Sequence, residues 1–105
     1  MNDTEFNVLA NQTLDQIECA LDLSGLDLDC SRVGDGVLEI EFETGSKIIV
    51  NRHAAAQEIW LAARSGGFHF RWDGQAWRDT RDAGELMSAL SRLVSDQSGA
   101  TVRLD

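Results

Sequence analysis

The fold of this chain is decided by the segment VLEIEFETGSKIIVN, residues 37–51, which has the pattern of a β-hairpin. Apolar and acidic side chains alternate along residues 37–43, as expected of a strand with one face on a core and the other in water. Thr44-Gly45-Ser46 supplies turn residues, and the chain then returns through a second strand at residues 47–51. The segment therefore predicts an antiparallel sheet with one buried face.

Further short strands are expected on both sides of this hairpin. Before it, Leu26, Leu28 and Cys30 alternate with polar residues, and a glycine-containing turn at residues 34–36 follows. After it, apolar stretches separated by turn signals predict strands around residues 58–62, 68–72 and 76–79. The chain is thus expected to form about six strands in consecutive order.

A helix is predicted at each end of the chain. Apolar residues recur at steps of three, four or seven from residue 3 to 22, with Asn2 or Asp3 available as the N-cap. Asp82, followed by Glu85 three residues later, predicts the start of a second helix that ends near Gly99.

The order of helix, consecutive strands and helix predicts an α+β fold. We expect a two-layer α/β sandwich, in which two helices pack on one face of an antiparallel sheet of about six strands. The length suits one domain, residues 1–105, and no linker, repeat or low-complexity segment divides it. The other face of the sheet must meet water, so its side chains are free to recognise a partner.

The charge of the chain is strongly one-sided. Residues 1–45 hold eleven of the eighteen carboxylates and a single basic residue, Arg32, which gives this part a formal charge of about −10. Residues 46–105, with eight basic and seven acidic residues, carry about +1. This distribution argues against nucleic-acid binding and favours cations or basic protein surfaces as partners.

No segment of the sequence predicts export or membrane insertion. The acidic start lacks the apolar region of a signal peptide, and no stretch approaches the roughly 18 apolar residues of a membrane span. Cys19 and Cys30 are not spaced as a redox motif or a zinc site, and they do not suggest a disulfide framework. We therefore expect a cytoplasmic protein.

Five carboxylates, here called the acidic ridge, form the main chemical signal. Asp15, Glu18 and Asp22 are spaced by three and four residues, which puts them on one side of the first helix. Asp27 and Asp29 are expected on the outward face of the next strand. Oxygen donors of this kind suit iron, calcium, magnesium or manganese, held weakly with part of their water retained. The alternative is that these acids only keep the surface solvated.

Trp60 is the second signal, because it is expected on the open face of the sheet. If its apolar neighbours face the core, Trp60 projects outward, and His69 and Arg71 of the next strand can flank it. An exposed tryptophan is typical of an interface anchor. His53 and His69 are isolated in the sequence and are expected at the surface rather than as metal ligands.

No catalytic constellation is present in the sequence. There is no glycine-rich phosphate loop, nucleophile elbow or HExxH motif, and no pair of carboxylates can be assigned as acid and base. We name no catalytic residue and expect the protein not to be an enzyme.

Four blocks of sequence carry a family resemblance. They are Met1–Phe6, Gly45–Arg52, Gln57–Ala62 and Gly67–Trp77. With these blocks in this order, the chain resembles the frataxin family, most closely its bacterial members, over essentially its full length. The resemblance implies the same two-layer fold. It also implies an iron-binding protein of iron–sulfur cluster assembly that docks on the cysteine desulfurase complex and regulates it or supplies iron.

The resemblance further implies which residues act. Four ridge acids match the family pattern, while Asp15 belongs to the ridge by helical geometry alone. Iron is the implied metal, bound weakly at the ridge, and the implied partners are the cysteine desulfurase and the iron–sulfur scaffold machinery. The residues implied in partner contact are Glu18, Asp22, Asn51, Trp60 and His69. The iron-free chain is expected to be a monomer.

The chain departs from the family pattern at a few positions. Cys19 stands in place of a common ridge acid, and Leu23 and Leu26 interrupt an otherwise acidic run, so the ridge is expected to bind fewer ions or to bind them more weakly. Glu58 stands where some relatives carry glutamine.

Two other functions stay open at this point. One is a ferroxidase or iron-storage protein. The other is an acidic protein-interaction module without a metal role.

Overall fold

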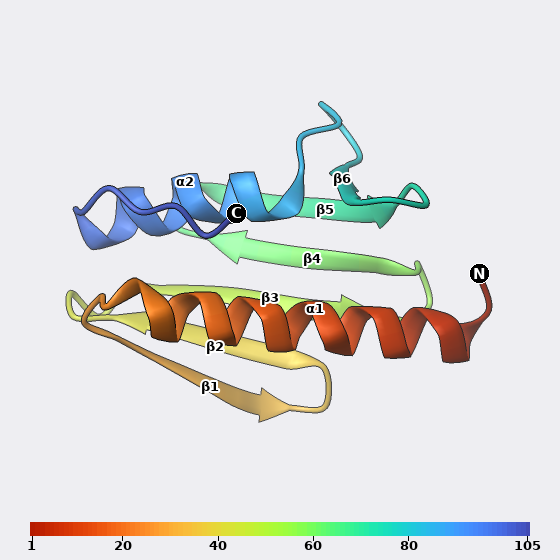
Figure 1. Ribbon diagram of the computed structural model, residues 1–105, viewed down its shortest axis with the longest axis horizontal. Helices are drawn as coiled ribbons and strands as arrows, with labels where there is room; N and C mark the ends of the chain where they lie inside the picture. Colours follow the sequence, from red (N-terminus) through yellow and green to blue (C-terminus); the bar gives the residue numbers. More distant parts are fainter.

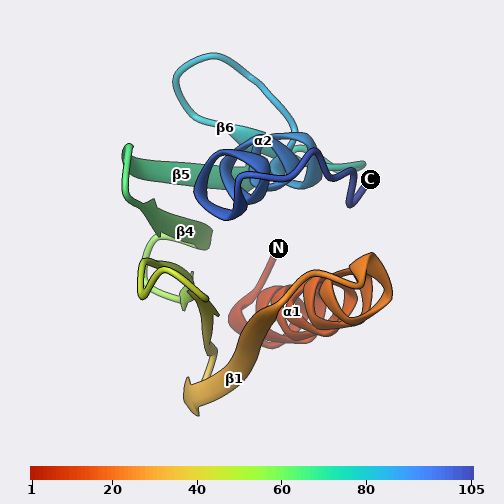
Figure 2. The ribbon, with the colours of Figure 1, turned by 90° about the vertical axis from the view of Figure 1, so that its left-hand side faces the viewer.

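Two helices lie side by side on one face of a single sheet in the computed structural model, which describes residues 1–105 (Figures 1 and 2). The elements in chain order are α1 Asp3–Ser24, β1 Leu28–Gly34, β2 Val37–Phe42, β3 Lys47–His53, β4 Glu58–Ala63, β5 Gly66–Trp72, β6 Trp77–Asp79 and α2 Leu86–Ser98. All neighbouring strands are antiparallel, and their order in the sheet is their order in the chain. The predicted fold class is confirmed.

The core lies between the helices and the inner face of the sheet. Leu38, Ile40 and Phe42 of β2 are buried, whereas the glutamates between them are not, as the alternation predicted. Both helices contribute apolar residues at helical spacing. Burial of each large apolar side chain contributes about 1.5–3 kcal/mol. The buried core residues are Phe6, Ala10, Leu14, Ile17, Leu21, Leu38, Ile40, Phe42, Ile48, Val50, Ile59, Leu61, Phe70, Trp77, Leu86, Ala89, Leu90, Leu93 and Val94.

The N-terminus of α1 is a capping box. The side chain of Asn2 accepts a hydrogen bond from the Glu5 amide at 2.8 Å, and the Glu5 carboxylate accepts one from the Asn2 amide at 3.3 Å. Of the two predicted caps, Asn2 is the one used. At the other end, Gly25 is left-handed, and the Leu28 amide bonds to the Leu26 carbonyl in a turn, so β1 begins at Leu28 rather than at Leu26.

The predicted N-cap of α2 is wrong. The cap is Glu85, whose side chain accepts from the Met87 amide at 3.0 Å. Asp82 instead accepts from the Gly84 amide at 2.8 Å in a local turn. The helix cannot start earlier, because Ala83 has a left-handed φ of 63° and Glu85 pairs with Arg78 in an isolated β-bridge.

The last residues of the chain run along α2 and are held by its serines. The amide of Val102 donates to Ser95 Oγ at 2.9 Å, and the amide of Leu104 donates to Ser91 Oγ at 2.8 Å. The side chains of Val102 and Leu104 pack against the core. The C-terminus therefore lies on the helix side, away from the open face of the sheet (Figure 2).

Neither helix is long and apolar enough to cross a membrane.

Candidate functional site

Three acidic-ridge residues lie on α1, and one arginine bonds to two of them. Arg32 of β1 donates from Nη2 to Asp15 Oδ1 at 2.7 Å and from Nε to Glu18 Oε1. Burial lowers the pKa of Arg32, but the bonds to Glu18 and Asp15 outweigh burial and raise this pKa above its ordinary value. Asp22 is exposed one turn beyond Glu18. Arg32 thus neutralises part of the charge on the ridge.

The other two ridge residues lie on a different side of β1. Asp29 is opposite Glu41 of β2, and side chains alternate along the strand, so Asp29 projects from the open face while its neighbours point toward α1. Asp27 precedes the strand and is exposed. A hollow of about 270 Å³ has Asp27, Asp29, Glu41 and Glu43 in its lining. The five carboxylates are therefore divided into two groups along one edge of the molecule.

The ridge is not a compact coordination site. No group of three or more His, Cys, Asp or Glu side chains is arranged to hold one metal ion. Five carboxylates and one guanidinium leave the ridge with a formal charge of −4. A cation attracted to this edge would contact one or two carboxylates and keep much of its water. Specific binding by all five residues stays a prediction.

Cys30 lies beneath the ridge as a neutral thiol. Burial raises its pKa to about 11, and the negative charges of Glu18 and Asp22 add to this rise, while Arg32 opposes it. A thiol with such a pKa is almost entirely protonated at neutral pH, so it is neither a good metal ligand nor a nucleophile. Cys19 is also a free thiol and is exposed on α1.

The second candidate surface is an aromatic stack on the open face of the sheet. The Trp60 ring on β4 lies between His53 of β3, with centroids 3.8 Å apart and planes at 12°, and His69 of β5, with centroids 4.5 Å apart and planes at 9°. The predicted outward direction of Trp60 and His69 is confirmed. His53 was missed as a partner because it reaches Trp60 diagonally and is paired with Glu58 in the strand register. The sequence feature that could have identified His53 is the period of two along β3, which puts Asn51 and His53 on the same face of the sheet.

Glu58 is buried beneath this stack, although it points to the open face. Its exposed fraction is 6%. Oε1 accepts a hydrogen bond from Trp60 Nε1 at 2.9 Å, and Oε2 accepts one from Arg71 Nη2 at 2.8 Å. His69 Nδ1 lies 3.6 Å from Oε1. Sequence reasoning did not foresee this carboxylate as the centre of the surface.

An apolar hollow adjoins the stack. Its volume is about 440 Å³, and Trp60 and His69 form part of its wall together with Asn51. The apolar lining comes from Val37, Ile49, Trp60, Leu61, Ala62 and Phe68. Exposed apolar surface of this kind, with polar groups beside it, is typical of protein–protein contact.

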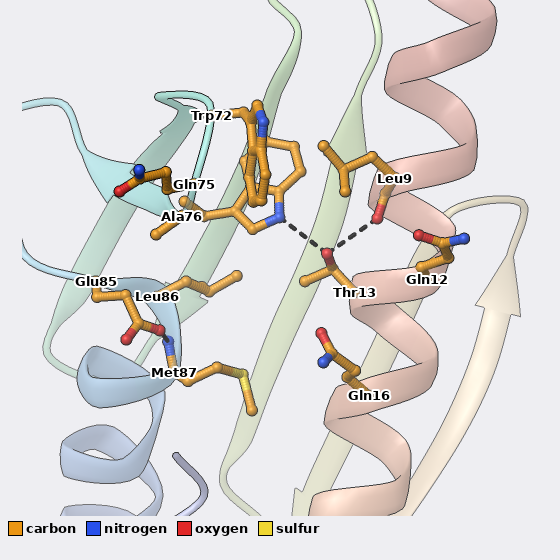
Figure 3. A pocket seen from close by; sticks show the side chains of 11 residues that line it. Leu9, Gln12, Thr13, Gln16, Trp72, Gln75, Ala76, Glu85, Leu86 and Met87 are labelled. Carbon is orange, nitrogen blue, oxygen red and sulfur yellow. Dashed lines mark hydrogen bonds between the residues drawn. The ribbon is translucent and has the colours of Figure 1, made fainter.

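The largest hollow lies between the helices and carries no comparable chemistry (Figure 3). It has a volume of about 650 Å³ and is lined partly by Trp72 and Trp77. Trp77 Nε1 donates to Thr13 Oγ1 at 2.8 Å, and this hydroxyl donates to the Leu9 carbonyl at 2.9 Å, so these polar groups already have partners. The only carboxylate in the lining is Glu85, which caps α2.

Comparison with known proteins gives one consistent result. A family model described as a frataxin-like domain matches residues 1–100. The iron-sulfur cluster assembly protein CyaY of Dechloromonas aromatica is 60% identical over 104 residues, covering 99% of each chain. The protein of the same name from Cupriavidus necator is 52% identical over 108 residues, covering 99% of this chain and 96% of its own.

Solved structures agree with this result. A frataxin from Psychromonas ingrahamii superposes with a TM-score of 0.92 at 35% identity, covering 100% of this chain and 99% of its own. A trimeric frataxin from Saccharomyces cerevisiae, described as complexed with ferrous iron, has a TM-score of 0.68 at 22% identity over 90% of this chain and 86% of its own, which shows a shared fold.

Proposed function

Because this chain belongs to the frataxin-like domain family, we propose that it is an iron-binding protein of iron–sulfur cluster assembly. Its relatives from Dechloromonas aromatica and Cupriavidus necator are named iron-sulfur cluster assembly proteins, which supports the assembly role. The yeast structure with ferrous iron supports iron as the cargo. We further propose that the iron-free chain is a cytoplasmic monomer that regulates a partner or supplies iron, and is not itself an enzyme.

The observation that carries this proposal is the uneven charge of the molecular edge formed by α1 and β1. The five ridge carboxylates, Asp15, Glu18, Asp22, Asp27 and Asp29, face one nearby base, Arg32. Such a surface attracts divalent cations and also steers the protein toward a basic partner. We propose that Glu18 and Asp22 serve both purposes, and that the basic partner is the cysteine desulfurase.

A second contact is proposed through the open face of the sheet. Trp60 and His69 stack beside an apolar hollow, and Asn51 lies next to them. A rigid aromatic residue with apolar area around it is the usual anchor of a protein interface. We propose that Asn51, Trp60 and His69 contact the scaffold machinery while the ridge contacts the desulfurase.

The proposal is tested by binding to a purified desulfurase and scaffold complex, with ferrous iron and with chelator. Glu18→Lys/Asp22→Lys is expected to lose ridge docking, and Trp60→Arg is expected to lose the sheet contact. The single variants Asp22→Lys and Asp96→Lys form a matched pair with equal charge change, since Asp96 lies on α2 in an exposed pair with Arg64 that contributes little stability. Wild-type binding by both the ridge variant and the Trp60 variant would refute both surfaces.

The same preparation separates the two alternatives. A ferroxidase or iron-storage protein would consume oxygen in the presence of ferrous iron, and storage would produce iron-driven assembly. An acidic interaction module without a metal role would bind its partner equally well in chelator. Residue-resolved NMR during an iron titration decides the metal role, because signals along the ridge are expected to move while those of the aromatic stack around Trp60 are not.

A further inference from the structure

The orientation of Trp60 is unusually well defined for a side chain on an open sheet face. An indole in such a place can ordinarily occupy several staggered rotamers. Here both ring faces are covered by imidazoles, with centroids at 3.8 and 4.5 Å. The ring nitrogen is also bonded, because Nε1 donates to Glu58 Oε1 at 2.9 Å. Two stacking contacts and one hydrogen bond therefore fix the ring.

Glu58 is the residue on which these contacts converge. It lies two residues before Trp60 on the same strand, so both side chains emerge on the same face. Its carboxylate is buried and lies close to polar groups of Trp60, Arg71 and His69. Burial of a carboxylate is costly unless it is paired, and both oxygens of Glu58 accept hydrogen bonds, from Trp60 and from Arg71. The positions of the Trp60, Glu58 and Arg71 side chains thus depend on one another.

We infer that Glu58 is a positioning residue, which holds Trp60 in the orientation required for docking and couples it to Arg71. This inference rests on the proposed docking role of Trp60. Glu58 acts through the indole and does not itself meet the partner, since it is buried. Arg71 supplies the positive charge that makes a buried carboxylate at this position tolerable, and 65% of its own side chain stays exposed.

A carboxylate and an amide at position 58 differ in the hydrogen bonds that they can form with Trp60 and Arg71. In Glu58→Gln, the amide oxygen can still accept from Trp60 Nε1, but the amide nitrogen then faces the Arg71 guanidinium, and both are donors. The variant therefore keeps the bond that orients the indole and loses the bond to Arg71. Glu58→Ala loses both bonds. Arg71→Ala leaves the bond to Trp60 in place but leaves Glu58 without its cation.

The direct test is the indole N–H signal of Trp60 in ¹⁵N NMR spectra. Trp60→Phe identifies the signal, and Trp77, whose Nε1 bonds to Thr13 in the core, gives an internal standard for intact folding. Glu58→Ala is expected to shift the Trp60 signal upfield and speed its solvent exchange at least tenfold, with the Trp77 signal unchanged. Glu58→Gln is expected to restore the Trp60 signal. A Trp60 signal that is the same in Glu58→Ala and wild type would overturn the inference.

Partner binding gives the functional test. Glu58→Ala is expected to weaken binding to the desulfurase and scaffold complex about tenfold, with Glu58→Gln recovering most of the loss. If Trp60→Arg binds like wild type, the docking role of Trp60 fails and the positioning role in docking falls with it. If Trp60→Arg loses binding but Glu58→Ala keeps full affinity, the positioning inference alone is refuted.

Discussion

Replacement of Arg32 by alanine should tighten cation binding at the acidic ridge. Arg32 bonds to Asp15 at 2.7 Å and also to Glu18, so it occupies two of the three ridge carboxylates on α1. Its removal changes the formal charge of the ridge from −4 to −5. Because a third of the Arg32 side chain and more of Asp15 are exposed, the loss of these pairs should cost less than about 1 kcal/mol of stability.

The size of the effect on binding follows from Coulomb repulsion. A divalent cation about 5 Å from the guanidinium is repelled by roughly 1.7 kcal/mol in water. Screening at physiological salt, where the Debye length is about 8 Å, reduces this repulsion to about 1 kcal/mol. Removal of the guanidinium should therefore lower the dissociation constant roughly fivefold. The two released carboxylates act in the same direction.

The assay is an anaerobic titration of ferrous iron followed by calorimetry and by amide signals of α1. Arg64→Ala is the matched control, because Arg64 forms an exposed 3.2 Å pair with Asp96 on α2 and its loss changes the net charge equally. Tighter binding in Arg32→Ala alone supports the reasoning. Equal dissociation constants for both variants and the wild type would refute it, since the ridge would then not be the site at which the cation binds.

Two further predictions concern the thiol of Cys30 and the turn that contains Gly36. Near pH 8, Cys30 should react with iodoacetamide about 100-fold more slowly than an ordinary thiol, because its pKa is raised to about 11 from 9.0. Peptide mass spectrometry should therefore show that Cys19 is labelled before Cys30. Equal labelling rates would contradict the argument that burial and nearby negative charge raise the pKa of Cys30. Gly36→Ala should lower the free energy of unfolding by about 2 kcal/mol or more in urea titrations, since φ is 75° and the new Cβ would lie 2.8 Å from Arg52 Nε. Gly45→Ala, with φ of 89° and no atom within 4 Å, should cost only the backbone strain, and an equal loss in both variants would exclude the contact with Arg52.

The fold could be predicted from the sequence because local signals agreed with one another. The alternation of apolar residues along β2 and their helical spacing along α1 each identified a buried face. The turns between successive strands are short, so these strands can pair only in antiparallel orientation. The start of α2 was misplaced because Asp82 has the same preference for an Asx turn as for a helix cap. The choice between them depends on the bridge between Arg78 and Glu85, which is a contact between separate segments.

The candidate surfaces could be predicted only in part. Alternation gave the outward direction of Trp60 and His69, since it depends on one strand at a time. The burial of Glu58 and the position of His53 depend on the register of three strands, which no single segment encodes. Likewise, Arg32 was identified as the only basic residue of residues 1–45, but its bonds to α1 depend on which face of β1 it occupies.

The path of the chain end along α2 has a practical consequence for surface-based binding experiments. Val102 and Leu104 are bonded to Ser95 and Ser91, and the chain end lies on the helix layer (Figure 2). The stack around Trp60 lies on the opposite, open face of the sheet. A biotin tag attached after Asp105 would therefore orient every immobilised molecule with its open sheet face toward the solution. A sensor chip prepared in this way would present the aromatic surface uniformly, and a flexible spacer would not be needed to expose it.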